Sequence, residues 1–201
     1  MNAALRPKVS RPWTDALRAT PVMPALHPTR RRAVLGGLAA VALQAASSAH
    51  AQAARSSDDR GGPLPSVGSR LPVPDVTLLD GRRLPAASLA GHLTVLYWWA
   101  SWCPFCAIQS PEMHRLWAAH AARGLRLLGL SIDRKPEDAQ AYLTKKGYGF
   151  PSAWVSPELR AQLPKPRGLP VTVVLGRDGR VLLAESGQMF AEDVDAIADW
   201  L

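Results

Sequence analysis

The chain has 201 residues, of which 47% are hydrophobic and 20% charged, and these proportions are ordinary for one soluble domain. They exclude a collagen-like chain, a coiled coil and a wholly disordered protein. The net charge of +8 is concentrated in residues 1–51, which hold seven Lys and Arg side chains and one acid, Asp15. The remaining residues hold 17 basic and 15 acidic side chains, so no nucleic-acid partner is expected.

The basic segment has the order of an export signal. Arg30-Arg31-Arg32 precede an uncharged run over residues 33–46, and Ala49-His50-Ala51 follows as a cleavage site. The run has 14 residues and is too short to cross a hydrocarbon core of about 30 Å as a helix. We predict that residues 1–51 are removed after Ala51 and that the protein meets the membrane only during export.

Two features of this signal leave alternatives open. Residues 29–35 resemble a twin-arginine signal, but Ala33 replaces the usual Phe, so the Sec route is the alternative. Met23 would begin a more compact signal than Met1 does, and it is the alternative start of translation. Neither choice affects the exported domain.

The first exported residues, 52–72, are rich in Gly, Ser, Pro, Arg and Asp and lack apolar periodicity. This composition predicts a flexible tether or an extended arm. The domain proper is expected over residues 73–201. The 150 residues that remain after cleavage can bury about 68–70% of the unfolded chain's surface, so folding needs no metal or disulfide.

Strands and helices are expected to alternate along the domain. Residues 76–79 before Asp80-Gly81 predict a strand entering a hairpin, and the apolar run 93–98 predicts a central strand buried on both faces. A helix over 103–122 follows, with apolar or small residues near helical spacing; they are Ile108, Met113, Leu116, Trp117 and Ala121.

The second half of the domain continues this alternation. A buried strand and a helix are expected at 125–132 and 136–146, which gives a right-handed parallel crossover. The elements expected beyond them are a short strand, a helical turn, two hairpin strands and a closing helix, at 154–155, 157–163, 171–175, 181–185 and 191–201. The fold class is therefore α/β, a central mixed sheet with helices on both faces.

The only two cysteines are Cys103 and Cys106, at the junction between the 93–98 strand and the following helix. Two intervening residues in a first helical turn bring both sulfurs within bonding range, so the pair can cycle between dithiol and disulfide. The ring is too small to stabilise the fold much through loop entropy, which argues against a structural disulfide. Metal ligation is disfavoured because a second ligand pair is absent, and no metal is expected.

The position of Cys103 predicts its reactivity. At a helix N-terminus, free backbone N–H groups and the helix dipole favour a thiolate. We expect Cys103 to be the attacking nucleophile and Cys106 to resolve the mixed disulfide. Pro104 would stiffen the first turn, and Phe105 adds apolar surface without charge.

Residues 73–201 resemble the thioredoxin-like superfamily and, within it, the TlpA-like exported thiol-disulfide oxidoreductases, which are related to the redoxin group that includes AhpC/TSA. The motifs that carry the resemblance are Leu79-Asp80-Gly81, the run Trp99-Ala100-Ser101-Trp102-Cys103-Pro104-Phe105-Cys106, Pro111, Ser131-Ile132-Asp133, Gly168-Leu169-Pro170-Val171-Thr172 and Arg177-Asp178-Gly179-Arg180.

The resemblance implies a thioredoxin-like fold with an N-terminal β-hairpin extension and a periplasmic protein disulfide reductase. Pro170 would be the cis-proline facing the cysteines, and Leu169 would turn its backbone toward the substrate. Trp102 and Trp99 would shield the thiolate and guide partners, and core packing is the alternative explanation of Trp99. The partners would be client protein disulfides and a membrane electron donor, and the Cys103–Cys106 disulfide would serve in place of a cofactor.

Two positions depart from the pattern. Relatives often have Glu where this chain has Gln109, and the strand position of a buried Asp in thioredoxin is Tyr97 here. Proton transfer during resolution would then use water or Glu112, one helical turn after Gln109.

Three other activities are weighed against the reductase. A disulfide oxidase or isomerase commonly has His between the cysteines, where this chain has Phe105. A thiol peroxidase resembling peroxiredoxins would have Thr or Ser three residues before its reactive cysteine, where Ala100 precedes Cys103. A Sco-like copper chaperone would need two cysteines with three residues between them and a distant downstream His, and the last histidine is His120.

Overall fold

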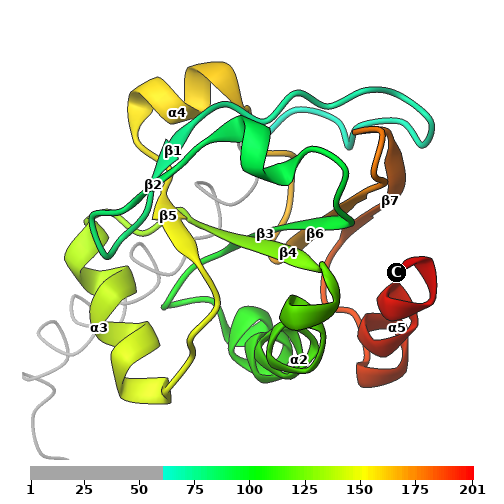
Figure 1. Cartoon of the computed structure of the whole chain (residues 1–201). Coiled ribbons are helices and arrows are strands. Elements are labelled where there is room, and N and C mark those ends of the chain that lie inside the picture. The colour runs from blue at the N-terminus through cyan, green and yellow to red at the C-terminus, as the bar shows by residue number, and fades with distance from the viewer. Residues whose placement is uncertain (1–60) are drawn as a thin grey trace, which may run out of the picture. The chain divides into compact units, whose positions relative to one another are not determined.

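The computed structural model describes residues 61–201 (Figure 1). Five strands form one mixed sheet in the order β5-β4-β3-β6-β7. Their bounds are β3 Thr94–Trp99, β4 Arg126–Ser131, β5 Ser152–Trp154, β6 Val171–Leu175 and β7 Val181–Ser186. The predicted export signal, its cleavage site and the alternative start at Met23 lie outside the described residues.

β3 is the central strand, as its apolar sequence predicts. All six of its residues are buried. It pairs in parallel with β4 and antiparallel with β6, so that Trp98 lies opposite Leu130 on one side and Val171 on the other. The antiparallel pairing places the last residues of β3 beside the first residues of β6, at the same end of these two strands.

Helices cover both faces of the sheet, which confirms the predicted α/β thioredoxin-like fold. Figure 1 shows α2, α3 and α5 below the sheet and α4 above it. Their bounds are α2 Pro104–His120, α3 Pro136–Lys146, α4 Pro157–Gln162 and α5 Ala191–Ala196. Short 3-10 turns complete the list: η1 Ala86–Leu89, η2 Ala121–Arg123 and η3 Ile197–Trp200.

The N-terminal hairpin consists of β1 (Val76–Thr77) and β2 (Arg83–Leu84), paired antiparallel. Gly81 in its turn has φ 83°, a left-handed conformation that costs glycine little. Leu79 N donates to Ser152 O over 2.7 Å, so the hairpin is attached to β5 at the edge of the main sheet.

Residues 61–72 form an extended arm bound to the domain. Gly62 forms a bridge with Pro166 and Arg70 one with Arg180. Gly68 N donates to Val181 O over 2.8 Å, and Val181 N donates to Ser69 O over 2.9 Å. A flexible tether is therefore the wrong description of 61–72, because its backbone groups find partners on the domain; residues 52–60 lie outside the described part.

The closing helix is shorter than the predicted 191–201, because α5 gives way to the 3-10 turn η3 at Ile197. Val194 and Ile197 are buried, as the predicted apolar face requires. Among the residues that the structure describes, none belongs to a helix of sufficient length and hydropathy to span a bilayer.

Candidate active site

Both cysteines lie where β3 passes into α2. Cys103 is the N-cap residue of α2, Pro104 opens its first turn, and Cys103 Sγ accepts a hydrogen bond from Cys106 N over 3.3 Å. Both cysteines are buried. A sulfur that accepts a backbone N–H at a helix N-terminus is stabilised as a thiolate, so the geometry supports Cys103 as the attacking residue.

The loop before Cys103 is fixed by Asp133, a buried residue that follows β4. Its carboxylate accepts from Ser101 N over 3.1 Å and 3.2 Å, from Ser101 Oγ over 2.7 Å and from Ser131 Oγ over 2.8 Å. Trp154 Nε1 donates to its backbone oxygen over 2.7 Å. Asp133 thus holds the backbone two residues before the nucleophile.

Asp133 is not among the site residues predicted from the sequence. The available signal was its place directly after a buried strand that is parallel to β3. Carboxyl ends of neighbouring parallel strands meet at one sheet edge, so Asp133 and the Cys103 loop were bound to be neighbours.

The Leu169–Pro170 peptide bond is cis. Pro170 directly precedes β6, and the antiparallel register therefore places it at the sheet edge where β3 leads into the cysteine loop. Pro170 O accepts from Gly187 N over 2.8 Å. Leu169 is buried. The buried Lys165 supports the approach to this loop by donating from Nζ to Gly168 O over 2.6 Å.

Gln109 connects three elements beneath the cysteines. Its side chain is fully buried; Nε2 donates to Thr172 Oγ1 on β6 over 2.9 Å, and Oε1 accepts from Met189 N over 2.8 Å. An amide satisfies both neighbours without carrying charge. The departure from Glu therefore gives α2 a neutral link to the segment before α5.

Tyr97 lies on β3 behind the cysteines. Its hydroxyl donates to Cys106 O over 3.4 Å and shares a hydrogen bond of 3.0 Å with Ser110 Oγ. Burial, followed by the nearby Cys106, raises the pKa of Tyr97 well above 10.0. A phenol that stays protonated cannot replace the general base that a buried Asp provides.

Large apolar side chains are exposed at the start of α2. Trp102 is 43% exposed, Phe105 55% and Ile108 54%. Ile108 was predicted from its helical spacing to lie with the apolar face, but only Met113 and Leu116 of that set are fully covered. Exposed apolar surface beside a reactive thiol suits the docking of another polypeptide.

Glu112 forms an ion pair with Arg115, whose guanidinium also binds Asp195 Oδ1 over 2.9 Å. The Arg115–Asp195 contact connects α2 with α5, whereas Glu112 and Arg115 both belong to α2. The ion pair of Glu112 is thus internal to its helix, and its suggested part in proton transfer stays a prediction.

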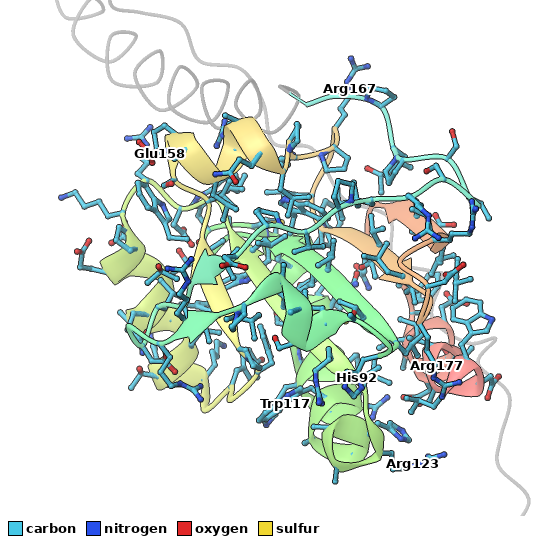
Figure 2. All side chains as sticks on the ribbon, turned by 45° about the horizontal axis from the view of Figure 1, so that its top comes forward. His92, Trp117, Arg123, Glu158, Arg167 and Arg177 are labelled. Carbon is cyan, nitrogen blue, oxygen red and sulfur yellow. The ribbon has the colours of Figure 1, made fainter. Side chains whose placement is uncertain are left out.

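Of the three histidines among the described residues, His114 packs against Trp117 and Tyr148 in the middle of α2, and the other two lie at the end of α2 away from the cysteines. His92 precedes β3 and contacts Arg126, and His120 ends α2 beside Arg123. Figure 2 shows His92 and Arg123 near this end of α2. Within residues 61–201, no group of three or more His, Cys, Asp and Glu is placed to hold a metal ion.

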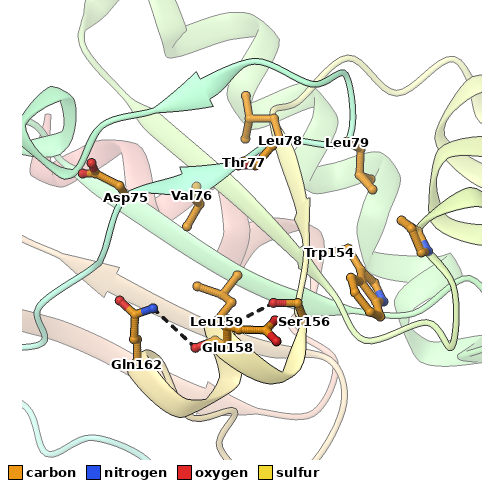
Figure 3. A pocket seen from close by; sticks show the side chains of 11 residues that line it. Asp75, Val76, Thr77, Leu78, Leu79, Trp154, Ser156, Glu158, Leu159 and Gln162 are labelled. Atoms are coloured by element: carbon orange, nitrogen blue, oxygen red, sulfur yellow. Dashed lines mark hydrogen bonds between the residues drawn. The ribbon is translucent and has the colours of Figure 1, made fainter.

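A pocket of about 370 Å³ lies between β1 and α4 (Figure 3). Asp75 and Glu158 are its titratable residues, and neither cysteine lines it. Because it contains no thiol, we place the reactive centre at the Cys103 loop.

Comparisons with known proteins agree with this geometry. The model of the AhpC/TSA family matches residues 67–182. The thiol-disulfide oxidoreductase ResA of Bacillus thuringiensis (strain Al Hakam) is 23% identical over 129 residues, which cover 64% of this chain and 75% of that protein.

Solved structures show the same fold. A putative thiol:disulfide interchange protein DsbE from Chlorobium tepidum has a TM-score of 0.56 and 27% identity, over 67% of this chain and 94% of that one. A thioredoxin family thiol:disulfide interchange protein from Chlorobium tepidum TLS has a TM-score of 0.59 and 24% identity, over 67% and 97%.

Proposed function

The chain belongs to the AhpC/TSA family and is a thiol-disulfide oxidoreductase, and from this premise we propose that it is an exported protein disulfide reductase with Cys103 and Cys106 as its redox pair. The observation that carries the proposal is the place of Cys103 Sγ, which caps α2 and accepts the Cys106 N–H. Because this contact stabilises negative charge on sulfur, it favours the reactive form of Cys103.

The reaction proceeds through a mixed disulfide. The Cys103 thiolate attacks one sulfur of a client disulfide, the client S–S bond breaks, and the first client sulfur leaves as a thiolate. Cys106 then loses its proton and attacks Cys103 Sγ, which releases the second client thiolate. Two electrons pass to the client, both client sulfurs take up protons, and the Cys103–Cys106 disulfide remains.

A membrane electron donor would return these two electrons and regenerate both thiols. Export to the periplasm, followed by cleavage after Ala51, would place the domain with such a donor and with folding clients. The redox-active cysteine pair then needs no additional cofactor.

The residues around the pair support a reductase over the other activities. Phe105 between the cysteines adds no positive charge that would stabilise the thiolate further, as a strong oxidant requires. Ala100, three residues before Cys103, has no hydroxyl with which to orient a peroxide. The two-residue spacing of the cysteines also differs from the spacing expected of a copper chaperone.

The redox potential tests this proposal. The full chain is equilibrated against glutathione buffers, with Cys103→Ser and Cys106→Ser as controls that cannot form the disulfide. A potential near about −270 mV, that of thioredoxin, is expected of the reductase. A value near about −120 mV would make the protein an oxidant, and failure to cycle would remove the proposed redox pair.

A further inference from the structure

A groove of about 540 Å³ opens between β7 and the segment formed by α5 and η3, which we name the β7–α5 groove. Its lining includes Phe190 and Trp200, whose exposed fractions are 69% and 42%. Leu183 and Ile197 add apolar surface beneath them. Aromatic side chains left exposed over a hollow of this size mark a place where another molecule binds.

The rim of this groove is acidic. Glu185, Asp193 and Asp199 line it, and no Lys, Arg or His is among its lining residues in the described part of the chain. Asp193 also caps α5 by accepting from Phe190 N over 3.3 Å. Three carboxylates around an apolar floor create a negative potential that favours a positively charged occupant.

The groove is connected to the cysteine site through two hydrogen bonds that backbone N–H groups donate. Gly187 lines the groove and donates to Pro170 O, and Met189, also in the lining, donates to Gln109 Oε1. Both contacts join the groove to elements that position the redox pair. β7 is also the edge strand of the sheet, and the arm pairs only with its first residue, Val181. Leu183, Glu185 and Ser186, which line the groove, lie beyond that pairing.

We propose that the β7–α5 groove binds the client polypeptide next to its disulfide, and that it selects a stretch with a large apolar side chain flanked by Lys or Arg. This inference rests on the proposed function, and it adds the chemistry by which clients are recognised. The apolar side chain covers Phe190 and Trp200, and the basic side chains face Glu185 and Asp199.

A second copy of this chain fits the groove less well. In a two-fold dimer the same patch meets itself, which would bring the carboxylates of both copies together. Like charges placed against each other at an interface oppose association. A client segment of opposite charge meets no such repulsion.

The test uses the full chain and two disulfide peptides. Both contain a Trp, which is flanked by Lys in one peptide and by Glu in the other, and the peptides are otherwise identical. We expect kcat/KM for reduction of the Lys peptide to exceed that of the Glu peptide about tenfold, and the ratio to shrink at high salt. Two double variants, Glu185→Gln/Asp199→Asn and Phe190→Ala/Trp200→Ala, test the groove. In each, kcat/KM for the Lys peptide should fall about tenfold because KM rises.

Matched controls are Glu137→Gln and Val67→Ala, which alter an exposed acid and an exposed apolar residue outside the groove. Both should keep the wild-type ratio. If the wild type reduces glutathione disulfide but handles both peptides equally, or if the groove variants keep the wild-type kcat/KM for the Lys peptide, the docking proposal is wrong and the proposed function stands.

If the protein reduces no disulfide, the proposed function fails, and a binding measurement then tests the groove separately. Fluorescence anisotropy of the Lys peptide with both cysteines replaced by Ser reports binding without chemistry. Binding weakened about tenfold by Glu185→Gln/Asp199→Asn supports the groove, and equal binding overturns it. A dimer seen by light scattering that Phe190→Ala/Trp200→Ala dissociates would assign the groove to a second copy instead.

Discussion

At the scale of single residues, the loop that carries Cys103 depends on one buried carboxylate. Ser101 donates to Asp133 through both its backbone N–H and its hydroxyl. Such bonds to a charged acceptor are stronger than neutral ones, and their number fixes the loop in one conformation. The nucleophile is therefore positioned from β4 as well as from its own helix.

Replacing this carboxylate tests its positioning role. Asp133→Asn should lower the free energy of unfolding by about 1–3 kcal/mol, because one carboxylate oxygen becomes an amide that cannot accept. Reduction of a client disulfide should slow by more than the unfolded fraction explains. Urea unfolding and single-turnover kinetics measure the two effects. Asp138→Asn on the exposed face of α3 is the control. Equal rates of client reduction in the two variants would show that Asp133 does not position the Cys103 loop.

Tyr97 gives a prediction for alkaline pH. Its folded pKa is raised, first by burial, so the native state keeps a proton that the unfolded chain loses near pH 10.0. Stability from this group is complete below pH 10.0 and is lost as pH rises above it.

Tyr97→Phe should therefore reduce the fall in urea midpoint above pH 10.0 and leave the pH dependence near neutrality unchanged. Tyr142 and Tyr148, whose pKa values are also raised by burial, keep part of the alkaline fall. An identical alkaline slope in the variant would show that the Tyr97 phenol ionises as freely in the folded state as in the unfolded chain.

At the scale of elements, β4 packs against its neighbours through a residue without a side chain. A Cβ at Gly129 would lie within 3.0 Å of Ser152 Oγ, the Phe150 ring and Trp99 Nε1. These three groups come from β5, the segment before it and β3. Close approach at Gly129 thus joins the strand that carries Asp133 to the one that leads to the cysteines.

Gly129→Ala should destabilise the domain by about 1–3 kcal/mol through overpacking, measured by urea unfolding. Gly62→Ala is the matched control, because a Cβ there would meet no atom within 4 Å. A Gly129→Ala protein as stable as the control would mean that β4 shifts at no cost.

At the scale of the whole molecule, most of the positive net charge lies in the segment that carries the proposed export signal. The basic surplus lies in residues 1–51, so the proposed cleavage after Ala51 would leave a nearly balanced domain. We expect mass spectrometry of the periplasmic fraction to find a mature chain beginning at Gln52. Replacing Arg30, Arg31 and Arg32 with Lys should block export on the twin-arginine route and leave Sec export unchanged. An uncleaved chain in that fraction would contradict the signal.

The features that depend on local pattern were predictable from the amino-acid sequence alone. Apolar runs identified β3 and β4, and the position of Cys103 before a helix gave its N-cap geometry. Asp80-Gly81 predicted the hairpin. These predictions succeeded because strand burial, helix starts and tight turns are encoded within a few consecutive residues.

Tertiary structure alone decided which distant residues meet. The bonds of Asp133 to Ser101, the exposure of Ile108, the arm at 61–72 and the β7–α5 groove all depend on contacts between elements far apart in the chain. Spacing along a sequence indicates that a residue is apolar or at a strand end. Only the packing of strands and helices determines whether its side chain is covered, bonded or left open for a partner.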